Sequence, residues 1–254
     1  MKPLRLIFVH VPKAGGTAIG KLLERQFGPA LLRDHDRPAD PSAPMNMDPA
    51  GFLERHARGG YDFLAGKAAV TGHLWARKYE PVEADIRAAI LRHPVGRTVS
   101  HYFFWTSSFD FKDHPLRRYV VEEKLDLLGF ARLPAIRYFY TRQMFRDVDM
   151  GRFDVVQRYE TLGAESSAFL SRIGVAGPLE TVNATEPLLS PEKRQEREAA
   201  RSDPKILGTL NALLADDIRF YEQTLERAYA RPPSFINRAF SRFQSRLASV
   251  ARLS

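Results

Sequence analysis

The sequence predicts an α/β fold, a parallel sheet flanked by helices, and two strand–turn–helix segments are the main evidence for it. In the first, an apolar run over residues 4–11 is typical of a buried strand, and a helical spacing of apolar residues continues after a glycine turn to Leu23. In the second, an apolar run ends at Leu91, and Pro94 suits the first turn of a helix because proline's missing N–H needs no partner there. Strands that alternate with helices favour a parallel sheet, and a length of 254 residues favours a single domain.

The first turn has the residues of an anion-binding site. Loop N–H groups converge at such a turn, the helix N-terminus adds partial positive charge, and Lys13 adds a full charge. In the nucleotide-triphosphate loop the Lys follows the second glycine and precedes Ser or Thr. Here Lys13 precedes both Gly15 and Gly16, so the anion is expected to be held differently. A tight strand–helix turn with an incidental Lys is the alternative.

The second turn carries another cation. Arg92 follows the strand directly, at the carboxyl end of the sheet, where open α/β sheets bind ligands. Arginine is the side chain best shaped for bidentate phosphate contacts, and Ser100 on the following helix adds a hydroxyl. Two separate anion sites predict a ligand with two separated phosphate groups.

These segments resemble a known family. The carbohydrate sulfotransferases related to heparan sulfate 2-O-sulfotransferase have a pattern similar to His10-x-Pro12-Lys13-x-Gly15-Gly16-Thr17 followed by Leu91-Arg92-x-Pro94-x-x-Arg97-x-x-Ser100-x-Tyr102. Weaker matches extend the resemblance over about residues 4–229: Thr71-Gly72-His73, Tyr140-Thr141-Arg142, Phe153-Asp154-Val155-Val156 with Glu160, Asn183-Ala184-Thr185, and Asp216-x-x-x-Phe220-Tyr221-Glu222. The family often has Thr, Ser, Asp and Glu where this chain has Ala14, Ala18, His93 and Gly96.

The resemblance implies a P-loop-like sheet, 3′-phosphoadenosine 5′-phosphosulfate (PAPS) as sulfuryl donor, no metal, and a hydroxyl acceptor on a glycan or glycolipid. It implies that Arg92 and Ser100 hold the 3′-phosphate, and that the 5′-phosphosulfate is held by Lys13, Ala14, Gly15, Gly16, Thr17 and Ala18. Lys13 is the natural cation for the leaving phosphate oxygen. A His in the Gly-His context of His73 is the base in the resembling enzymes, and an imidazole titrates near neutral pH. A His73 bonded only to backbone at a strand end is the alternative.

Other polar residues of these motifs have structural interpretations. We expect His10 to be a hydrogen-bonded core residue within the first strand, and His101 to pack against neighbouring aromatic rings. His93 is a candidate for the rim of the acceptor site. Arg97 either supports the 3′-phosphate or pairs internally, and residues 183–185 are candidates for a loop over the donor.

Composition limits the class of protein. The chain has no cysteine, which excludes a disulfide framework and a thiolate metal site, and 44% hydrophobic with 27% charged residues favours a folded globule. With no signal peptide or membrane-spanning stretch visible, we expect a cytoplasmic protein. The net charge of +8 suits anionic ligands, and no helix-turn-helix or zinc-finger pattern indicates specific nucleic-acid binding.

Two other functions remain open from the sequence. A nucleotide or sugar kinase would need a triphosphate site and Mg²⁺. A non-catalytic module that binds polyanions would keep the anion-binding turns without the base. The response to a bisphosphate nucleotide and to ATP with Mg²⁺ separates all three.

The remaining segments are expected as follows. Residues 28–66 form a loop-rich insertion with one short helix capped by Asp48, and the alternating charges of residues 33–37 mark a surface loop rather than a metal cluster. The spacing predicts strands at 68–72 and 153–156, a helix at 95–106, helical structure over 115–147, and helices that begin at Pro191 and Pro204.

The chain is expected to divide into a catalytic domain, residues 1–231, and a helical C-terminal extension, residues 232–254. In this extension apolar residues recur at helical spacing among four arginines, and no acidic residue follows Ser234. A basic amphipathic helix of this kind lies on an anionic membrane surface or docks on protein, and the sequence leaves both open.

Overall fold

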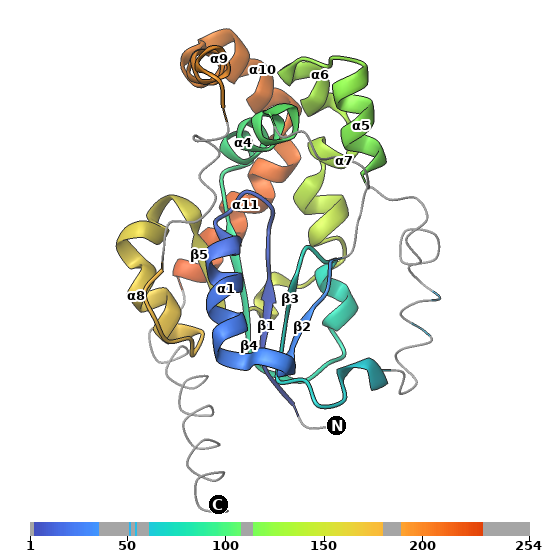
Figure 1. The fold of residues 1–254 in the computed structure, drawn as a ribbon, viewed down its shortest axis with the longest axis vertical. Helices are drawn as coiled ribbons and strands as arrows, with labels where there is room; N and C mark the ends of the chain where they lie inside the picture. The colour runs from blue at the N-terminus through green and yellow to red at the C-terminus, as the bar shows by residue number, and fades with distance from the viewer. Residues whose placement is uncertain are drawn as a thin grey trace, which may run out of the picture.

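The computed structural model describes residues 3–35, 51, 54, 61–107, 114–179 and 189–230, and these form an α/β fold around a parallel sheet (Figure 1). The sheet has five strands in the order β2-β3-β1-β4-β5. Their bounds are β1 Leu4–Val9, β2 Leu31–Arg33, β3 Ala69–Gly72, β4 Ala84–Leu91 and β5 Val155–Arg158. The predicted α/β fold with a parallel sheet flanked by helices is confirmed.

The central strand, β1, is apolar along nearly its whole length because it is covered on both faces. Leu6, Phe8 and Val9 are fully buried, as expected for a strand inside a parallel sheet. β1 pairs in parallel with β3 on one side and with β4 on the other. The turns that follow these three strands therefore emerge side by side at the carboxyl edge of the sheet.

Most helices begin at signals that are visible in the sequence. α4 begins at Pro94, α9 at Pro191 and α10 at Pro204, and the side chains of Ser190 and Asp203 cap the latter two. The α-helices are α1 Gly16–Phe27, α4 Pro94–Ser107, α5 Pro115–Glu122, α6 Leu127–Arg132, α7 Pro134–Arg137, α8 Leu162–Arg172, α9 Pro191–Ser202, α10 Pro204–Leu213 and α11 Ala215–Tyr229. Short helical segments are η1 Gly28–Ala30, η2 Asp62–Leu64, η3 Ala76–Tyr79, the π-helix η4 Phe139–Met144, η5 Met150–Arg152 and η6 Tyr159–Thr161.

Two apolar clusters stabilise this arrangement. The sheet cluster joins the strands to α1, α8 and part of α11, and includes Leu6, Phe8, Ile90 and Phe169. The helical cluster joins α4, α6, α9 and α10, and includes Val99, Phe103, Phe130 and Leu210. Figure 1 shows α4, α5, α6, α9 and α10 gathered at the end of the molecule where the strands finish.

The predicted strands at 68–72 and 153–156 and the predicted helix at 95–106 correspond to β3, β5 and α4. The expectation of a loop-rich insertion with one short helix over residues 28–66 omitted the edge strand β2 at residues 31–33 and the short helical segments η1 and η2. This strand has only three residues, which is too short for a periodic pattern. The helix predicted at Asp48, the segment 183–185 and the tail 232–254 lie outside the described residues. Among the helices that are described, none has the length and hydropathy needed to cross a membrane.

Candidate anion-binding and catalytic site

The ends of adjacent strands bring the predicted site residues together. Lys13 follows β1, Arg92 follows β4, and His73 follows β3, so all three lie at the carboxyl edge of neighbouring strands. The side chain of Arg92 crosses to the neighbouring turn, where its Nη1 donates a hydrogen bond to the backbone carbonyl of Lys13 at 2.9 Å. The two cation-bearing turns therefore form one continuous site.

The turn after β1 has the backbone conformation of an anion-binding loop. Lys13 and Gly15 both have positive φ angles, 65° and 77°. When right-handed and left-handed backbone conformations alternate along a chain, successive N–H groups point toward the same side. The N-cap residue of α1 is Gly15, which has no side chain to satisfy the first N–H groups of the helix. The N–H groups of Gly16, Thr17 and Ala18 therefore face the region before the helix.

The backbone N–H of Ala14 forms a hydrogen bond within the turn. The N–H of Ala14 donates to the carbonyl of Val11 at 3.2 Å, which closes the turn itself. This N–H thus already has a partner within the turn, whereas the role predicted for Ala14 toward the 5′-phosphosulfate stays a prediction. The Ala14 side chain is fully buried beneath the loop.

Gly16 is required by a close approach. An ideal Cβ at Gly16 would lie 1.9 Å from Cδ2 of His10, so any side chain here would displace the imidazole. The His10 ring thus packs directly against the start of α1. His10 itself lies one residue beyond β1, not within the strand as expected, and it is only partly buried.

Lys13 is a cation in an unfavourable environment. Its Nζ lies 4.0 Å from the centroid of the Phe104 ring on α4, a cation–π contact. Burial, followed by the charges of Arg92 and Arg197, lowers the pKa of Lys13 to about 8. An anion bound beside this ammonium group would offset both effects, because it supplies the missing opposite charge.

Ser100 lies on the side of α4 that faces Lys13. It precedes Phe104 by four residues, so the two side chains share one face of the helix. Because Phe104 contacts the Lys13 ammonium group, this face is turned toward the anion-binding loop. Ser100 is 5% exposed.

Arg92 is held from several directions. Its guanidinium carbon lies 4.3 Å from the centroid of the Tyr159 ring, and its backbone N–H and carbonyl both contact the hydroxyl of Tyr140. Burial lowers its pKa, while the neighbouring Tyr159 and Glu160 act in the opposite direction. This arrangement fixes the guanidinium group before any ligand arrives.

The geometry of His73 defines its tautomer. Its Nδ1 lies 2.8 Å from the backbone carbonyl of His10. A carbonyl oxygen only accepts hydrogen bonds, so Nδ1 carries the proton and Nε2 carries a lone pair. Burial is the main cause that lowers the pKa of His73 to about 4. The neutral imidazole is thus prepared to accept a proton at Nε2.

Two further histidines surround His73. The ring centroids of His10 and His73 are 4.3 Å apart, and those of His35 and His73 are 5.2 Å apart. The backbone N–H of His73 faces Nδ1 of His35 at 3.5 Å. Within the described part of the chain, no group of three or more His, Cys, Asp or Glu side chains is arranged to hold a metal ion.

The end of β2 packs directly on the end of β3. An ideal Cβ at Gly72 would lie 1.4 Å from the backbone oxygen of Asp34, so glycine permits this contact. The Asp34 carboxylate accepts a hydrogen bond of 2.6 Å from the hydroxyl of Tyr79. These contacts place His35 beside His73, a neighbour that the sequence did not predict.

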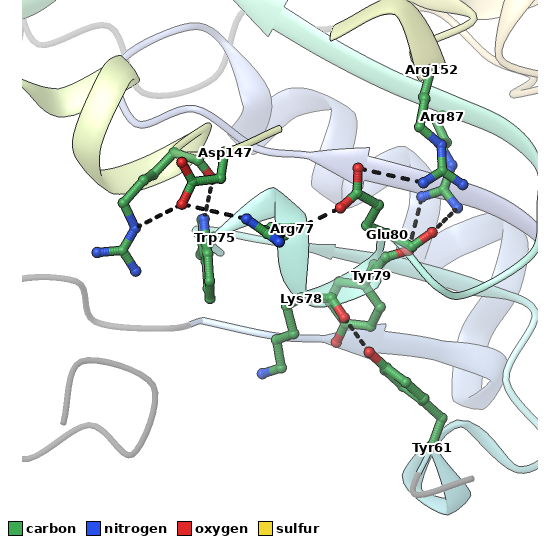
Figure 2. Close-up of polar contacts among 10 residues, drawn as sticks. Tyr61, Trp75, Arg77, Lys78, Tyr79, Glu80, Arg87, Asp147 and Arg152 are labelled. Carbon is green, nitrogen blue, oxygen red and sulfur yellow. Dashed lines mark hydrogen bonds and ion pairs between the residues drawn. The ribbon is translucent and has the colours of Figure 1, made fainter. Parts of the chain in front are cut away.

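Polar contacts also fix the segment that follows His73 (Figure 2). The indole N–H of Trp75 donates to the backbone carbonyl of Arg146 at 2.8 Å. Arg77 forms an ion pair with Asp147, with 3.4 Å between Nη1 and Oδ2. The backbone on the carboxyl side of His73 is therefore joined to the segment after η4.

The remaining motif residues are structural. Arg97 is fully buried; it donates to the carbonyl of Ile136 and stacks on the Phe139 ring, so it pairs internally. His101 packs against aromatic rings as expected, with the Trp105 centroid 4.4 Å away. His93, a candidate for the rim of the acceptor site, lies edge-on against the Tyr221 ring at 5.4 Å between centroids.

Sequence reasoning missed Arg197 as a neighbour of the site. It lies on α9, is 7% exposed, and its charge lowers the pKa of Lys13. More than one hundred residues of sequence separate it from Arg92, and no local motif marks it. Only the packing of α9 against α4 brings it close.

Comparisons with known proteins add little. No protein-family model matches the chain, and no curated protein matches it. One solved structure that matches is that of the mouse sulfotransferase SULT7A1 complexed with PAP, at 10% sequence identity and a TM-score of 0.33, over 82% of this chain and 88% of that chain. Similarity at this level carries no argument about this chain. The fold described above and the function proposed below depend on the chain's own residues.

Proposed function

We propose that this protein is a PAPS-dependent sulfotransferase that transfers a sulfuryl group to a carbohydrate hydroxyl. The observation that carries this proposal is the 2.9 Å hydrogen bond from Arg92 to the carbonyl of Lys13. It joins two cation-bearing turns into one site. A ligand that carries phosphate groups at both ends of a nucleoside needs two such turns close together.

Each part of the site has a distinct task. The N–H groups of Gly16, Thr17 and Ala18 and the Lys13 ammonium group would hold the 5′-phosphosulfate. Arg92 and Ser100 would hold the 3′-phosphate, since a guanidinium group and a hydroxyl both donate to phosphate oxygens. Ala14 belongs to the same turn, and its buried side chain contributes to the packing of the turn.

Sulfuryl transfer resembles phosphoryl transfer, in which positioning and electrostatics dominate. The acceptor hydroxyl loses its proton as its oxygen bonds to sulfur, and Nε2 of His73 takes that proton. The bond from sulfur to the bridging phosphate oxygen breaks, and the negative charge that develops on this oxygen is stabilised by Lys13. The bond from Nδ1 of His73 to the His10 carbonyl stabilises the imidazolium that forms.

The two alternative functions, a kinase and a polyanion-binding module, would each require a site that differs from this one. A kinase would place a Lys after the second glycine, whereas Lys13 precedes both glycines and has a positive φ angle. A polyanion-binding module would not need a neutral imidazole held in one tautomer, as His73 is. Both observations favour sulfuryl transfer.

The test is nucleotide binding measured by thermal denaturation and calorimetry. We expect 3′,5′-adenosine bisphosphate to stabilise the protein, by about 2.7 kcal/mol at a hundredfold excess over the dissociation constant. Lys13→Ala and Arg92→Ala should each reduce this stabilisation. Stabilisation by ATP with Mg²⁺ and none by the bisphosphate would replace this proposal with a kinase.

For the acceptor we propose a hydroxyl on a glycan or glycolipid. A lipid-linked acceptor would agree with a membrane contact through residues 232–254, which carry arginines and apolar residues at helical spacing. Sedimentation with anionic liposomes, for the full chain and for a chain lacking residues 234–254, tests this contact. Equal failure of both to sediment would remove the membrane part of the proposal.

A further inference from the structure

A single buried hydroxyl satisfies both backbone polar groups of Arg92. The N–H of Arg92 donates to the Tyr140 hydroxyl at 3.1 Å, and this hydroxyl donates to the Arg92 carbonyl at 2.7 Å. Tyr140 is fully buried, and burial raises the pKa of its hydroxyl, so the group stays protonated and keeps its donor.

This contact occurs where regular sheet pairing stops. β4 ends at Leu91, which is the last residue in register with β5. Arg92 is the next residue, and α4 begins two residues later, so neither strand nor helix satisfies the polar groups of its backbone. The Tyr140 hydroxyl takes this role, and the side chain of Arg92 then extends to the carbonyl of Lys13.

Tyr140 is itself held by a buried carboxylate. Asp217 on α11 is fully buried and accepts hydrogen bonds from the N–H groups of Tyr140 and Thr141, at 2.8 Å and 3.0 Å. The Thr141 hydroxyl donates to the same carboxylate at 2.8 Å. These bonds fix the beginning of η4, a π-helix, which is an unusual geometry that often occurs near functional sites.

We propose that Tyr140 is a positioning residue of the anion site: its hydroxyl fixes the backbone from which Arg92 reaches the Lys13 loop, and Asp217 holds Tyr140 in place. The contacts form one chain, from the Asp217 carboxylate through Tyr140 and Arg92 to Lys13. The identity of the anion rests on the proposed function, but the chain of contacts does not. Removal of the Tyr140 hydroxyl leaves the Arg92 guanidinium group in the protein but no longer fixes its orientation.

The test compares Tyr140→Phe with Tyr102→Phe. Tyr102 is a matched control, because it is 5% exposed and its hydroxyl also donates to a backbone carbonyl, that of Leu125, at 3.1 Å. Both variants lose a hydroxyl that is bonded to backbone, two hydrogen bonds in Tyr140→Phe and one in Tyr102→Phe, so urea denaturation of both measures how much stability each loses. Only Tyr140→Phe should weaken binding of 3′,5′-adenosine bisphosphate, by about five- to tenfold, because it removes both hydrogen bonds that hold the backbone of Arg92. In steady-state kinetics, KM for the donor should rise while KM for the acceptor stays constant.

Two outcomes would overturn the inference. One is wild-type affinity in a folded Tyr140→Phe protein. The other is an equal loss of affinity in Tyr102→Phe, which would indicate a general effect of lower stability. If Tyr140→Phe does not fold, Thr141→Ala removes only one bond to Asp217 and should weaken binding in the same direction; unchanged affinity in that variant would equally contradict the proposal.

Inorganic pyrophosphate serves as a second probe that separates this inference from the proposed function. If the wild type binds pyrophosphate but not the bisphosphate, the proposed function fails, and the two tyrosine variants still decide the role of Tyr140 with pyrophosphate. If the wild type binds neither probe, the anion site is wrong, and the inference falls with it.

Discussion

The protonation state of Lys13 should control donor affinity. The pKa of this group in the ligand-free protein is about 8, below its ordinary 10.5, because burial and the charges of Arg92 and Arg197 disfavour the ammonium form. Only the ammonium form can pair with an anion. Raising the pH through 8 should therefore weaken binding of 3′,5′-adenosine bisphosphate, whereas an ordinary lysine would keep its charge until about pH 10.

The magnitude follows from the titration curve. With a pKa of about 8, roughly nine tenths of Lys13 is protonated at pH 7 and roughly one tenth at pH 9. If the bound anion restores the charge, affinity falls about tenfold between these pH values. At pH 8 the free protein should take up roughly half a proton for each ligand that binds.

Isothermal titration calorimetry at pH 7, 8 and 9 and constant ionic strength measures both quantities. Proton uptake comes from the dependence of the observed enthalpy on the ionisation enthalpy of the buffer. The second pKa of a phosphate monoester is about 6, so the ligand itself changes little in this range.

Lys13→Arg is the control, because a guanidinium group keeps its charge throughout this range. Its affinity should stay constant from pH 7 to 9, without proton uptake at pH 8. The reasoning would be refuted if the wild type bound with equal affinity at pH 7 and 9 and took up no proton, because Lys13 would then keep an ordinary pKa.

Three further predictions concern histidines and glycine. His10, His73 and His101 all have pKa values lowered mainly by burial, so the native state binds fewer protons than the unfolded state below pH 6.5. The stability associated with these neutral histidines is complete above pH 6.5 and is lost as the pH falls toward the folded pKa values, by up to about 1.4 kcal/mol per pH unit for each histidine. Urea denaturation at pH 7 and pH 5 measures this loss, and equal stability at both pH values would contradict it. His73→Ala should lower acceptor-dependent transfer by about 10²–10⁴-fold with bisphosphate affinity unchanged, and full retention of the rate would exclude it as the base. Gly16→Ala should weaken bisphosphate binding because its Cβ would meet His10 at 1.9 Å, whereas Gly20→Ala in the same helix, with its nearest neighbour at 4.0 Å, should not.

The sequence predicted those parts of the site that depend on local pattern. Lys13 and Arg92 follow apolar strands, and the central position of β1 brings these turns together. Contacts between segments that are distant in sequence produce no local pattern from which they could be predicted. The bonds between Asp217 and the backbone of residues 140 and 141 span more than seventy residues of chain. Nothing in the order of residues identifies a buried carboxylate as the partner of a π-helix.

The edge of the sheet was harder to predict for a different reason. β2 has three residues and is followed by Asp34 and His35, which resemble an ordinary charged loop. Its identity as a strand comes from pairing with β3, which supplies partners from outside the segment. The neighbour of His73 was missed together with this strand.

The two apolar clusters give the site a property that neither has alone. Lys13 belongs to a turn built on the sheet cluster, whereas Ser100 is carried by α4, which packs into the helical cluster. Local opening of the helical cluster would displace Ser100 from the proposed site and leave Lys13 and Arg92 in place. A ligand that contacts both Ser100 and Lys13 should therefore raise the free energy of that opening, and we expect amide hydrogens in α10 to exchange more slowly when 3′,5′-adenosine bisphosphate is bound. If the proposed site binds such a ligand, we expect the two separately packed regions to unfold together.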